Sequence, residues 1–210
     1  VSVGRNELSE EDYDFYKKMI DIADFVGVEG VLYRTQTGEL TVRAEKVELL
    51  SKAMRPLPEK FHGLVDQEAK YRQRYLDLIS SEETRKVMVG RSKAMKFIRN
   101  FLNDHGFMEV ETPILQSAVC GASAKPFFTK HNALNKMCNL RIAPETYLKQ
   151  VISAGFDRVF EMGKVFRNEG MDTQHLQEFT MCEWYASYWD FEKNITFFQE
   201  FMRSLLMNVI

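Results

Sequence analysis

The sequence contains few cysteines, few prolines and no long apolar run. Three of its 210 residues are cysteine, and none of the three forms a C-x-x-C pair: Cys120, Cys138 and Cys182. A disulfide framework or a structural zinc site needs clustered cysteines, so we expect reduced thiols in a cytoplasmic protein. No stretch approaches the roughly 18 apolar residues that a membrane-spanning helix needs. The acidic start, Glu7 to Asp14, has the wrong sign for a targeting peptide, and we expect no membrane partner.

An excess of charge of one sign is also missing. The 28 Lys and Arg and 30 Asp and Glu give a formal net charge of −2, which excludes a globally basic nucleic-acid coat protein but not a local basic site. With 45% apolar and 28% charged residues, the composition excludes a disordered tail, a collagen-like fibre and a membrane bundle. The charge is uneven along the chain: residues 1–85 carry 13 basic against 17 acidic residues, and residues 86–210 carry 15 against 13. We therefore expect two pieces.

The first piece is predicted to contain a helix and a hairpin. Ser9 followed by Asp12 is typical of a helix start, and apolar residues up to Ile20 recur at helical spacing. Two strand-like runs follow at 25–35 and 39–50, the second with alternating apolar residues, and Thr37-Gly38 supplies the turn. A lone hairpin is marginal in water, so residues 1–58 are interpreted as the C-terminal part of a small β-barrel.

Residues 59–80 are predicted to be a polar connector between two domains. Two prolines, Pro56 and Pro58, end the strands before it. Its stretch from Tyr71 to Tyr75 contains two tyrosines and two arginines, which suits either an interdomain brace or an RNA-facing patch. We favour the brace because charge runs mostly serve structure or solvation.

The second piece, residues 81–210, is predicted to mix helices with strands. A helix at 82–103 ends before Gly106. Further elements are expected in chain order: a strand at 107–112 cut off by Pro113, a strand at 140–143, a helix at 145–153 behind Pro144, a hairpin at 158–188 and a helix at 192–209. The whole chain is thus predicted to be α+β.

The hairpin at 158–188 carries the strongest functional signal. Alternate residues of a strand share one face, which groups Glu161 with Arg167 on the first strand and Phe179, Glu183 and Tyr185 on the second. If these two faces meet, carboxylates, an arginine and aromatic rings line one surface. Such a surface suits a cationic amine beside a polyphosphate, because carboxylates pair with ammonium groups and arginine clamps phosphate. Both faces are partly apolar, so we expect the sheet to be covered on both sides.

Several motifs resemble those of the class II lysyl-tRNA synthetases. Residues 166–170, His175 and residues 178–185 resemble motif 2 of that family, and residues 106–113 resemble motif 1. Other matching segments are 52–58, 71–79, 121–127 and 141–145. The resemblance implies an oligonucleotide-binding (OB-type) anticodon barrel followed by an antiparallel-sheet catalytic domain. It also implies that the first barrel strands and the third class II motif lie outside this sequence.

The resemblance also implies roles for individual residues. Arg167 is the expected catalytic residue, holding the α-phosphate of ATP. The expected ATP-binding residues are Arg167, Glu169, His175, Phe179 and Met181. The expected lysine-binding residues are Gly121, Glu145, Glu183 and Tyr185. The expected dimer-interface residues are Phe107, Glu109 and Pro113. Ligands for Mg²⁺ are expected beyond Ile210, so no metal site is expected within the chain.

The implied function is ATP-dependent ligation of lysine to its cognate tRNA through a lysyl-adenylate, by a homodimeric parent protein; this chain alone is expected to be weak or inactive. One alternative is a lysine ligase that acts on a protein such as elongation factor P, which the hairpin at 20–55 disfavours. Another is a truncated, non-enzymatic relative that serves dimerisation or RNA binding, which the intact Arg167, Glu169, Glu145 and Glu183 disfavour. Aspartyl and asparaginyl relatives share the architecture, but two pocket glutamates suit a cationic substrate better.

Overall fold

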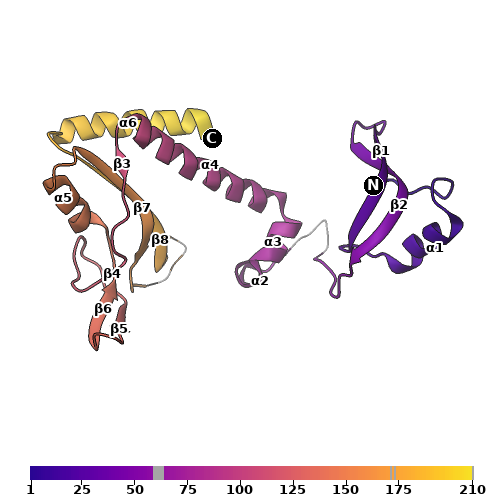
Figure 1. Cartoon of the computed structure of the whole chain (residues 1–210), viewed down its shortest axis with the longest axis horizontal. Helices are drawn as coiled ribbons and strands as arrows, with labels where there is room; N and C mark the ends of the chain where they lie inside the picture. Colours follow the sequence, from indigo (N-terminus) through magenta and orange to yellow (C-terminus); the bar gives the residue numbers. More distant parts are fainter. Residues whose placement is uncertain (59–63, 171, 173, 210) are drawn as a thin grey trace. The chain divides into compact units, whose positions relative to one another are not determined.

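The computed structural model describes residues 1–58, 64–170, 172 and 174–209. The chain divides into two compact units, Val1–Lys86 and Val87–Ile210, and each is described by itself (Figure 1). Positions 59–63 of the predicted connector, and positions 171 and 173 of the predicted hairpin loop, lie outside the described residues. In the described ranges no helix is both long and apolar enough to cross a membrane.

The first unit contains the predicted helix and hairpin. Helix α1 (Glu10–Met19) begins after Ser9, whose Oγ accepts a hydrogen bond from the backbone N–H of Asp12 at 3.0 Å. Strands β1 (Phe25–Arg34) and β2 (Leu40–Ser51) pair antiparallel. The helix packs on the sheet through a small apolar cluster whose buried members are Leu8, Ala44 and Val47.

The alternation predicted for β2 is interrupted by a bulge. The register shifts between Glu29 and Gly30, where the backbone carbonyl of Arg43 occupies the space that a side chain at position 30 would need. Ala44 and Val47, which are three positions apart across the bulge, are both buried, whereas Leu40 is exposed. In the part of the chain that the structure describes, β1 and β2 form a two-stranded sheet and no closed barrel.

The predicted connector contains two short helices, α2 (Gln67–Arg72) and α3 (Arg74–Ser80). Each arginine of the Tyr71–Tyr75 stretch pairs with a carboxylate of its own helix, at N···O distances of 2.7 and 2.8 Å, and both tyrosines are exposed. The carboxylate on α3 is Asp77, which is 1% exposed. The arginines therefore stabilise the helices themselves.

The second unit is organised around one hairpin. Strands β7 (Arg158–Phe166) and β8 (Glu178–Ala186) pair antiparallel, within the predicted range. Helices α4 (Glu82–Asp104) and α6 (Phe191–Val209) begin and end within one residue of their predicted bounds. The buried apolar cluster comes from these helices, from β7 and from the residue before β3: Phe101, Leu102, Phe107, Phe160, Phe197 and Phe201.

Helix α5 (Glu145–Ser153) has its predicted bounds and contacts both strands of the hairpin (Figure 1). On β7, Phe160 points toward α4 and α6, whereas Val159 and Val165 point to the opposite face of the hairpin. Both valines are fully buried. The hairpin is thus covered on both faces, as the apolar residues on both faces predicted.

The strand predicted at 107–112 is shorter than expected. Only β3 (Met108–Glu109) is a strand, and it pairs with β7 in parallel rather than antiparallel. Further along, Thr112 leaves the ladder because its backbone N–H and hydroxyl donate to the carboxylate of Glu161.

The strand predicted at 140–143 is also misplaced. Strand β6 (Lys136–Leu140) ends there and lies between β4 (Leu115–Gln116) and β5 (Phe128–His131) in a second, antiparallel sheet. Beyond it, the backbone of Arg141 connects separate elements: its N–H donates to the carbonyl of residue 114, and its carbonyl accepts from residue 166, at 2.9 Å each.

Candidate active site

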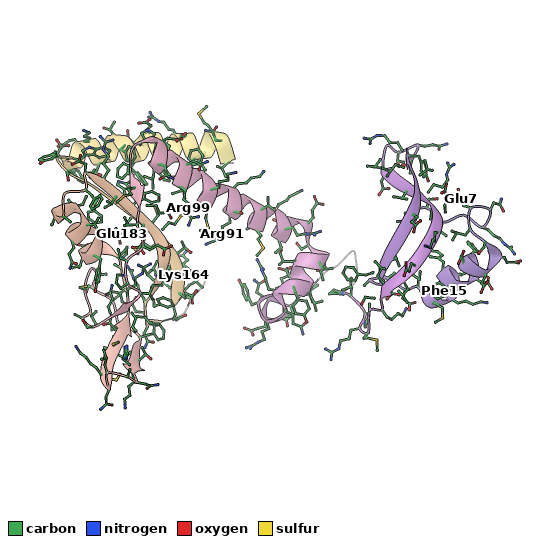
Figure 2. The ribbon with its side chains drawn as sticks, viewed as in Figure 1. Glu7, Phe15, Arg91, Arg99, Lys164 and Glu183 are labelled. Atoms are coloured by element: carbon green, nitrogen blue, oxygen red, sulfur yellow. The ribbon has the colours of Figure 1, made fainter. Side chains whose placement is uncertain are left out.

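The polar residues predicted on the hairpin share one face. In the ladder, Glu161 lies opposite Glu183 and Val165 lies opposite Phe179. Directly paired residues of antiparallel strands point to the same side of a sheet. We call this side the site face; on the two strands it comprises Val159, Glu161, Gly163, Val165, Phe179, Met181, Glu183 and Tyr185. Figure 2 marks Glu183 on it.

One end of the site face combines an arginine with an aromatic ring. Just beyond β7, the Arg167 guanidinium carbon lies 5.3 Å from the ring centroid of Phe179, a distance at which a cation is attracted to the ring. Its Nε also donates to the carbonyl of Ile142 at 3.4 Å. Met181 is the next residue of the face, opposite Gly163. This end therefore combines a guanidinium group that can bind phosphate with a flat aromatic ring.

The other end concentrates negative charge. Burial raises the pKa of Glu183, and the nearby charges of Glu145 and Glu161 raise it further. The Tyr185 hydroxyl, which donates to Glu183 Oε2 at 3.3 Å, and the Arg167 charge act against this rise. Burial also raises the pKa of Tyr185, which keeps its hydroxyl protonated as a donor. A half-buried group of carboxylates of this kind favours a bound cation.

Glu145 and Gly121 join this end from outside the hairpin. Glu145 is the first residue of α5, and its Oε1 lies 2.5 Å from Nζ of Lys149, which in turn lies 5.9 Å from the Tyr185 ring centroid. Gly121 has a φ of +88°, and a Cβ added there would lie 3.3 Å from Cβ of Glu145. Through Glu145, the structure therefore brings together all four residues predicted to bind lysine.

Glu169 and His175 lie in the loop between the two strands, and both are exposed. Glu169 Oε1 accepts a hydrogen bond from the backbone of Lys125 at 3.4 Å. His175 Nδ1 lies 2.7 Å from Asp172 Oδ2. Among the contacts of the described residues, none joins His175 to the site face.

The three residues predicted at a dimer interface have different surroundings. Phe107 is 2% exposed and packs against Trp189 and Phe197 within its own chain. Its side chain contacts the core of its own chain, and the place of Phe107 at a dimer interface stays a prediction. Glu109 and Pro113 are exposed.

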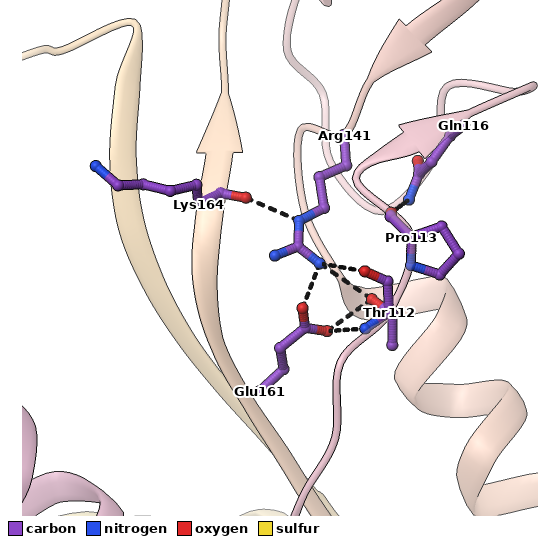
Figure 3. A network of polar contacts seen from close by, with 6 residues as sticks. All are labelled: Thr112, Pro113, Gln116, Arg141, Glu161 and Lys164. Carbon is purple, nitrogen blue, oxygen red and sulfur yellow. Dashed lines mark hydrogen bonds and ion pairs between the residues drawn. The ribbon is translucent and has the colours of Figure 1, made fainter.

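Arg141, for which no role was predicted, is 2% exposed and lies in a network of polar contacts (Figure 3). Its Nε donates to the carbonyl of Lys164 at 2.8 Å, and its Nη1 donates to Glu161 and to Thr112. A Cβ at position 163 would overlap its guanidinium. A glycine inside a predicted strand is a signal of close approach by another group, so Gly163 could have indicated a neighbour but not which one.

One cavity lies apart from this site. A cavity of about 420 Å³ opens near the other end of the hairpin, with Arg158 and Trp189 among its lining residues, and contains none of the predicted site residues. Within the described ranges, no group of three or more His, Cys, Asp or Glu side chains could hold a metal ion. The three cysteines are free, as expected.

Comparison with known families agrees with this geometry. Residues 66–210 match the family model described as "tRNA synthetases class II (D, K and N)". The chain belongs to this family. The match includes both hairpin strands and α5, which together carry the site face and Glu145 of this class II synthetase chain.

Curated relatives of the synthetase chain are named lysine–tRNA ligase. A protein of Methylobacillus flagellatus is 51% identical over 204 residues, covering 97% of this chain and 40% of the relative. One from Aquifex aeolicus is 52% identical over 206 residues, covering 98% and 34%. One from Aeromonas hydrophila is 52% identical over 210 residues, covering 100% and 41%. The chain thus spans about two fifths of the length of these relatives or less.

Proposed function

We propose that this chain carries part of an active site that activates lysine with ATP and transfers it to its cognate tRNA. The observation that supports this most directly is the site face, with Glu145 and Glu183 at one end and Arg167 over Phe179 at the other. The side-chain ammonium group of a lysine substrate fits the carboxylate end of the site face. In that orientation the carboxylate of the substrate is directed toward the arginine end. The names of the curated relatives support lysine as the amino acid.

The proposed reaction has two steps. An oxygen of the lysine carboxylate attacks the α-phosphorus of ATP, the bond from that phosphorus to the bridging oxygen breaks, and pyrophosphate leaves with the electron pair. The 3′-hydroxyl of the terminal tRNA ribose then attacks the carbonyl carbon of the adenylate and releases AMP. Arg167 neutralises charge at the α-phosphate, so catalysis rests on alignment and electrostatic stabilisation rather than on a covalent enzyme intermediate.

The remaining predicted residues support ATP binding in this proposal. Phe179 stacks on the adenine, Met181 lies beside it on the site face, Glu169 serves the adenine from the loop, and His175 approaches the terminal phosphates. The described residues assemble no metal site, so none of these steps is assigned to Mg²⁺, the metal that the family resemblance implies.

We also propose the domain organisation expected from the sequence. Residues 1–58 form the C-terminal part of an OB-type barrel that binds the anticodon, residues 59–80 connect, and residues 81–210 form the N-terminal part of the catalytic domain. The exposed apolar side chains of β1 and β2 support this, because further barrel strands would cover them: Phe25, Val31, Leu32, Leu40 and Leu50. The proposed assembly is a cytoplasmic homodimer with Phe107, Glu109 and Pro113 near the interface.

Lysine-dependent ATP–pyrophosphate exchange tests the proposed function. It should be measured on this chain and on a version extended at both ends to the length of the relatives. We expect the extended version to exchange and the 210 residues alone to be very weak. An extended version that folds but shows no lysine-dependent exchange would contradict the proposal.

A single variant tests the lysine pocket within the same assay. Glu183→Gln in the extended version should raise KM for lysine by about 10–100-fold, since a charged hydrogen-bond partner is lost, and leave KM for ATP nearly unchanged. The matched control is Glu178→Gln on the same strand, whose exposed carboxylate pairs with Lys164 at 2.9 Å outside the site face. Equal effects of Glu183→Gln on lysine and ATP would remove Glu183 from the ammonium pocket.

A further inference from the structure

A buried ion pair adjoins the carboxylate end of the site face. Glu161 is 4% exposed and lies directly opposite Glu183 in the hairpin. One of its carboxylate oxygens accepts from Arg141, and the other accepts from the backbone N–H and the hydroxyl of Thr112, at 3.2 and 2.6 Å (Figure 3). Such full pairing is what allows a carboxylate to stay charged away from water.

Arg141 reaches the site face because residue 163 has no side chain. Its guanidinium lies where a Cβ of residue 163 would stand. Gly163 is the next residue after Glu161 on this face and lies opposite Met181. The next pair on the same face contains Phe179. The positive charge of Arg141 therefore lies between the end that would bind an ammonium group and the end that would bind ATP.

We propose that Arg141 and Glu161 are positioning residues that set how strongly Glu183 attracts the cationic end of the substrate, an inference that rests on the lysine activation proposed above. While Arg141 offsets its charge, the carboxylate at position 161 repels Glu183 less than it would without a partner. Losing either member of the pair leaves a buried charge of one sign beside the pocket.

The charged and titratable groups around Glu183 come from every element packed against it. They are Glu145 and Lys149 on α5, Arg141 before α5, Glu161 on β7, Arg167 beyond β7, and Tyr185 on β8. The Arg141–Glu161 pair is the most deeply buried of these, with 2% and 5% of the two side chains exposed. Water and salt screen a buried pair least, so changing it should affect Glu183 strongly.

The test measures the pH dependence of kcat/KM for lysine in the extended version, at saturating ATP. At saturating ATP, the acidic limb of this profile reports an ionisation of the enzyme–ATP complex that binds lysine, and the inference assigns that ionisation to Glu183. Glu161→Gln removes a negative neighbour and leaves Arg141 unpaired, so the limb should move to lower pH. Arg141→Met leaves Glu161 unpaired, so the limb should move to higher pH. Each shift should be about one pH unit, as expected for a charge within a few ångströms.

Two more variants separate electrostatics from damage to the fold. The double variant Arg141→Met/Glu161→Met removes both charges and should return the limb close to its original pH, because apolar side chains often replace a buried ion pair without loss of fold. Thr112→Val keeps both charges but removes the hydroxyl that binds Glu161, and should shift the limb slightly to higher pH. It serves in place of Arg141→Met should that variant fail to fold.

Opposite shifts of the two single variants, with recovery in the double variant, support the inference. KM for ATP should change less than about twofold, well under one tenfold step in affinity. Shifts of the same sign, or lower activity with an unmoved limb, would overturn it and leave the pair with a purely structural role. Absence of lysine-dependent exchange by the unsubstituted extended protein would instead overturn the proposed function, and this inference with it.

Discussion

In the first unit the buried apolar cluster has three members, Leu8, Ala44 and Val47. The two that lie on a strand, Ala44 and Val47, have small side chains. In the second unit the corresponding cluster has six members, five of them phenylalanine. The hairpin β1–β2 has many exposed apolar side chains, whereas β7–β8 is covered on both faces. The polar residues of the site face therefore lie on a hairpin whose other side is buried by helices, whereas β1–β2 leaves apolar side chains in solvent.

The aromatic cluster of the second unit explains how the site face is held. Trp184 on β8 alternates with Glu183 and Tyr185, so its ring points away from the site face, toward Phe197 and Phe201 of α6. Side chains that bind substrate need a rigid support behind them. Here the support is a set of interlocked rings.

The largest expected effect comes from removing the ring at the centre of that cluster. The Phe197 ring lies within 5.7 Å, centroid to centroid, of the rings of Phe101, Phe107, Trp184 and Trp189. Phe197→Ala should therefore lower the free energy of unfolding by about 3–5 kcal/mol. Both tryptophans of the sequence lie in the second unit, so their fluorescence during urea denaturation follows that unit.

The matched change in the first unit is Leu32→Ala. Leu32 is 63% exposed on β1, so the loss should stay within about 0.5 kcal/mol, measured by far-ultraviolet circular dichroism. A cost similar to that of Phe197→Ala would show that the first unit buries this side chain after all, and the contrast between the units would fail.

An intermediate effect is expected from two glycines of the second unit. Gly163→Ala places a methyl group on the guanidinium of Arg141 and should destabilise by about 1–3 kcal/mol. Gly90→Ala, in α4 with open space around it, should stabilise by about 0.5–1 kcal/mol because alanine favours the helix. Denaturation followed by tryptophan fluorescence compares the two. A neutral Gly163→Ala would mean that Arg141 moves aside freely.

The smallest effect concerns acid in the first unit. The Asp24 carboxylate accepts hydrogen bonds from the backbone N–H of Asp21 and Ala53 and from Lys52, which lower its pKa from 3.8 to about 2. Because the folded pKa lies below the unfolded one, this stabilisation is complete above about pH 4 and is lost as pH falls toward 2. Peptides from β2 should lose protection against hydrogen exchange over this range, measured relative to the intrinsic exchange rate at each pH.

Asp24→Asn should abolish this acid dependence in the first unit. Peptides from β7 and β8 provide the internal control, since they do not contain the Asp24 contacts. Equal acid sensitivity of the variant and the original chain would assign the change to other carboxylates.

The hairpin of the site was predictable because a strand repeats every two residues. That period alone placed Glu161 on one face with Phe179 and Glu183, and the ladder confirmed it. Arg167 lies one residue beyond β7, and its contact with the Phe179 ring places it at the same face. The position of Arg141 was not predictable, because it depends on a contact between chain segments more than twenty residues apart. Thr112 shows the same limit: a local pattern placed it in a strand, but its bonds to Glu161 turn it away.

The cysteines make the two sheets of the second unit separately observable. Cys138 is buried in β6, and Cys182 lies on β8 against the aromatic cluster, where burial raises its pKa to about 11. Near neutral pH the Cys182 thiol therefore stays protonated and reacts slowly with alkylating reagents. The rate at which Cys182 is labelled therefore measures how often the hairpin opens transiently. The labelling rate of Cys138 measures the same for the smaller sheet.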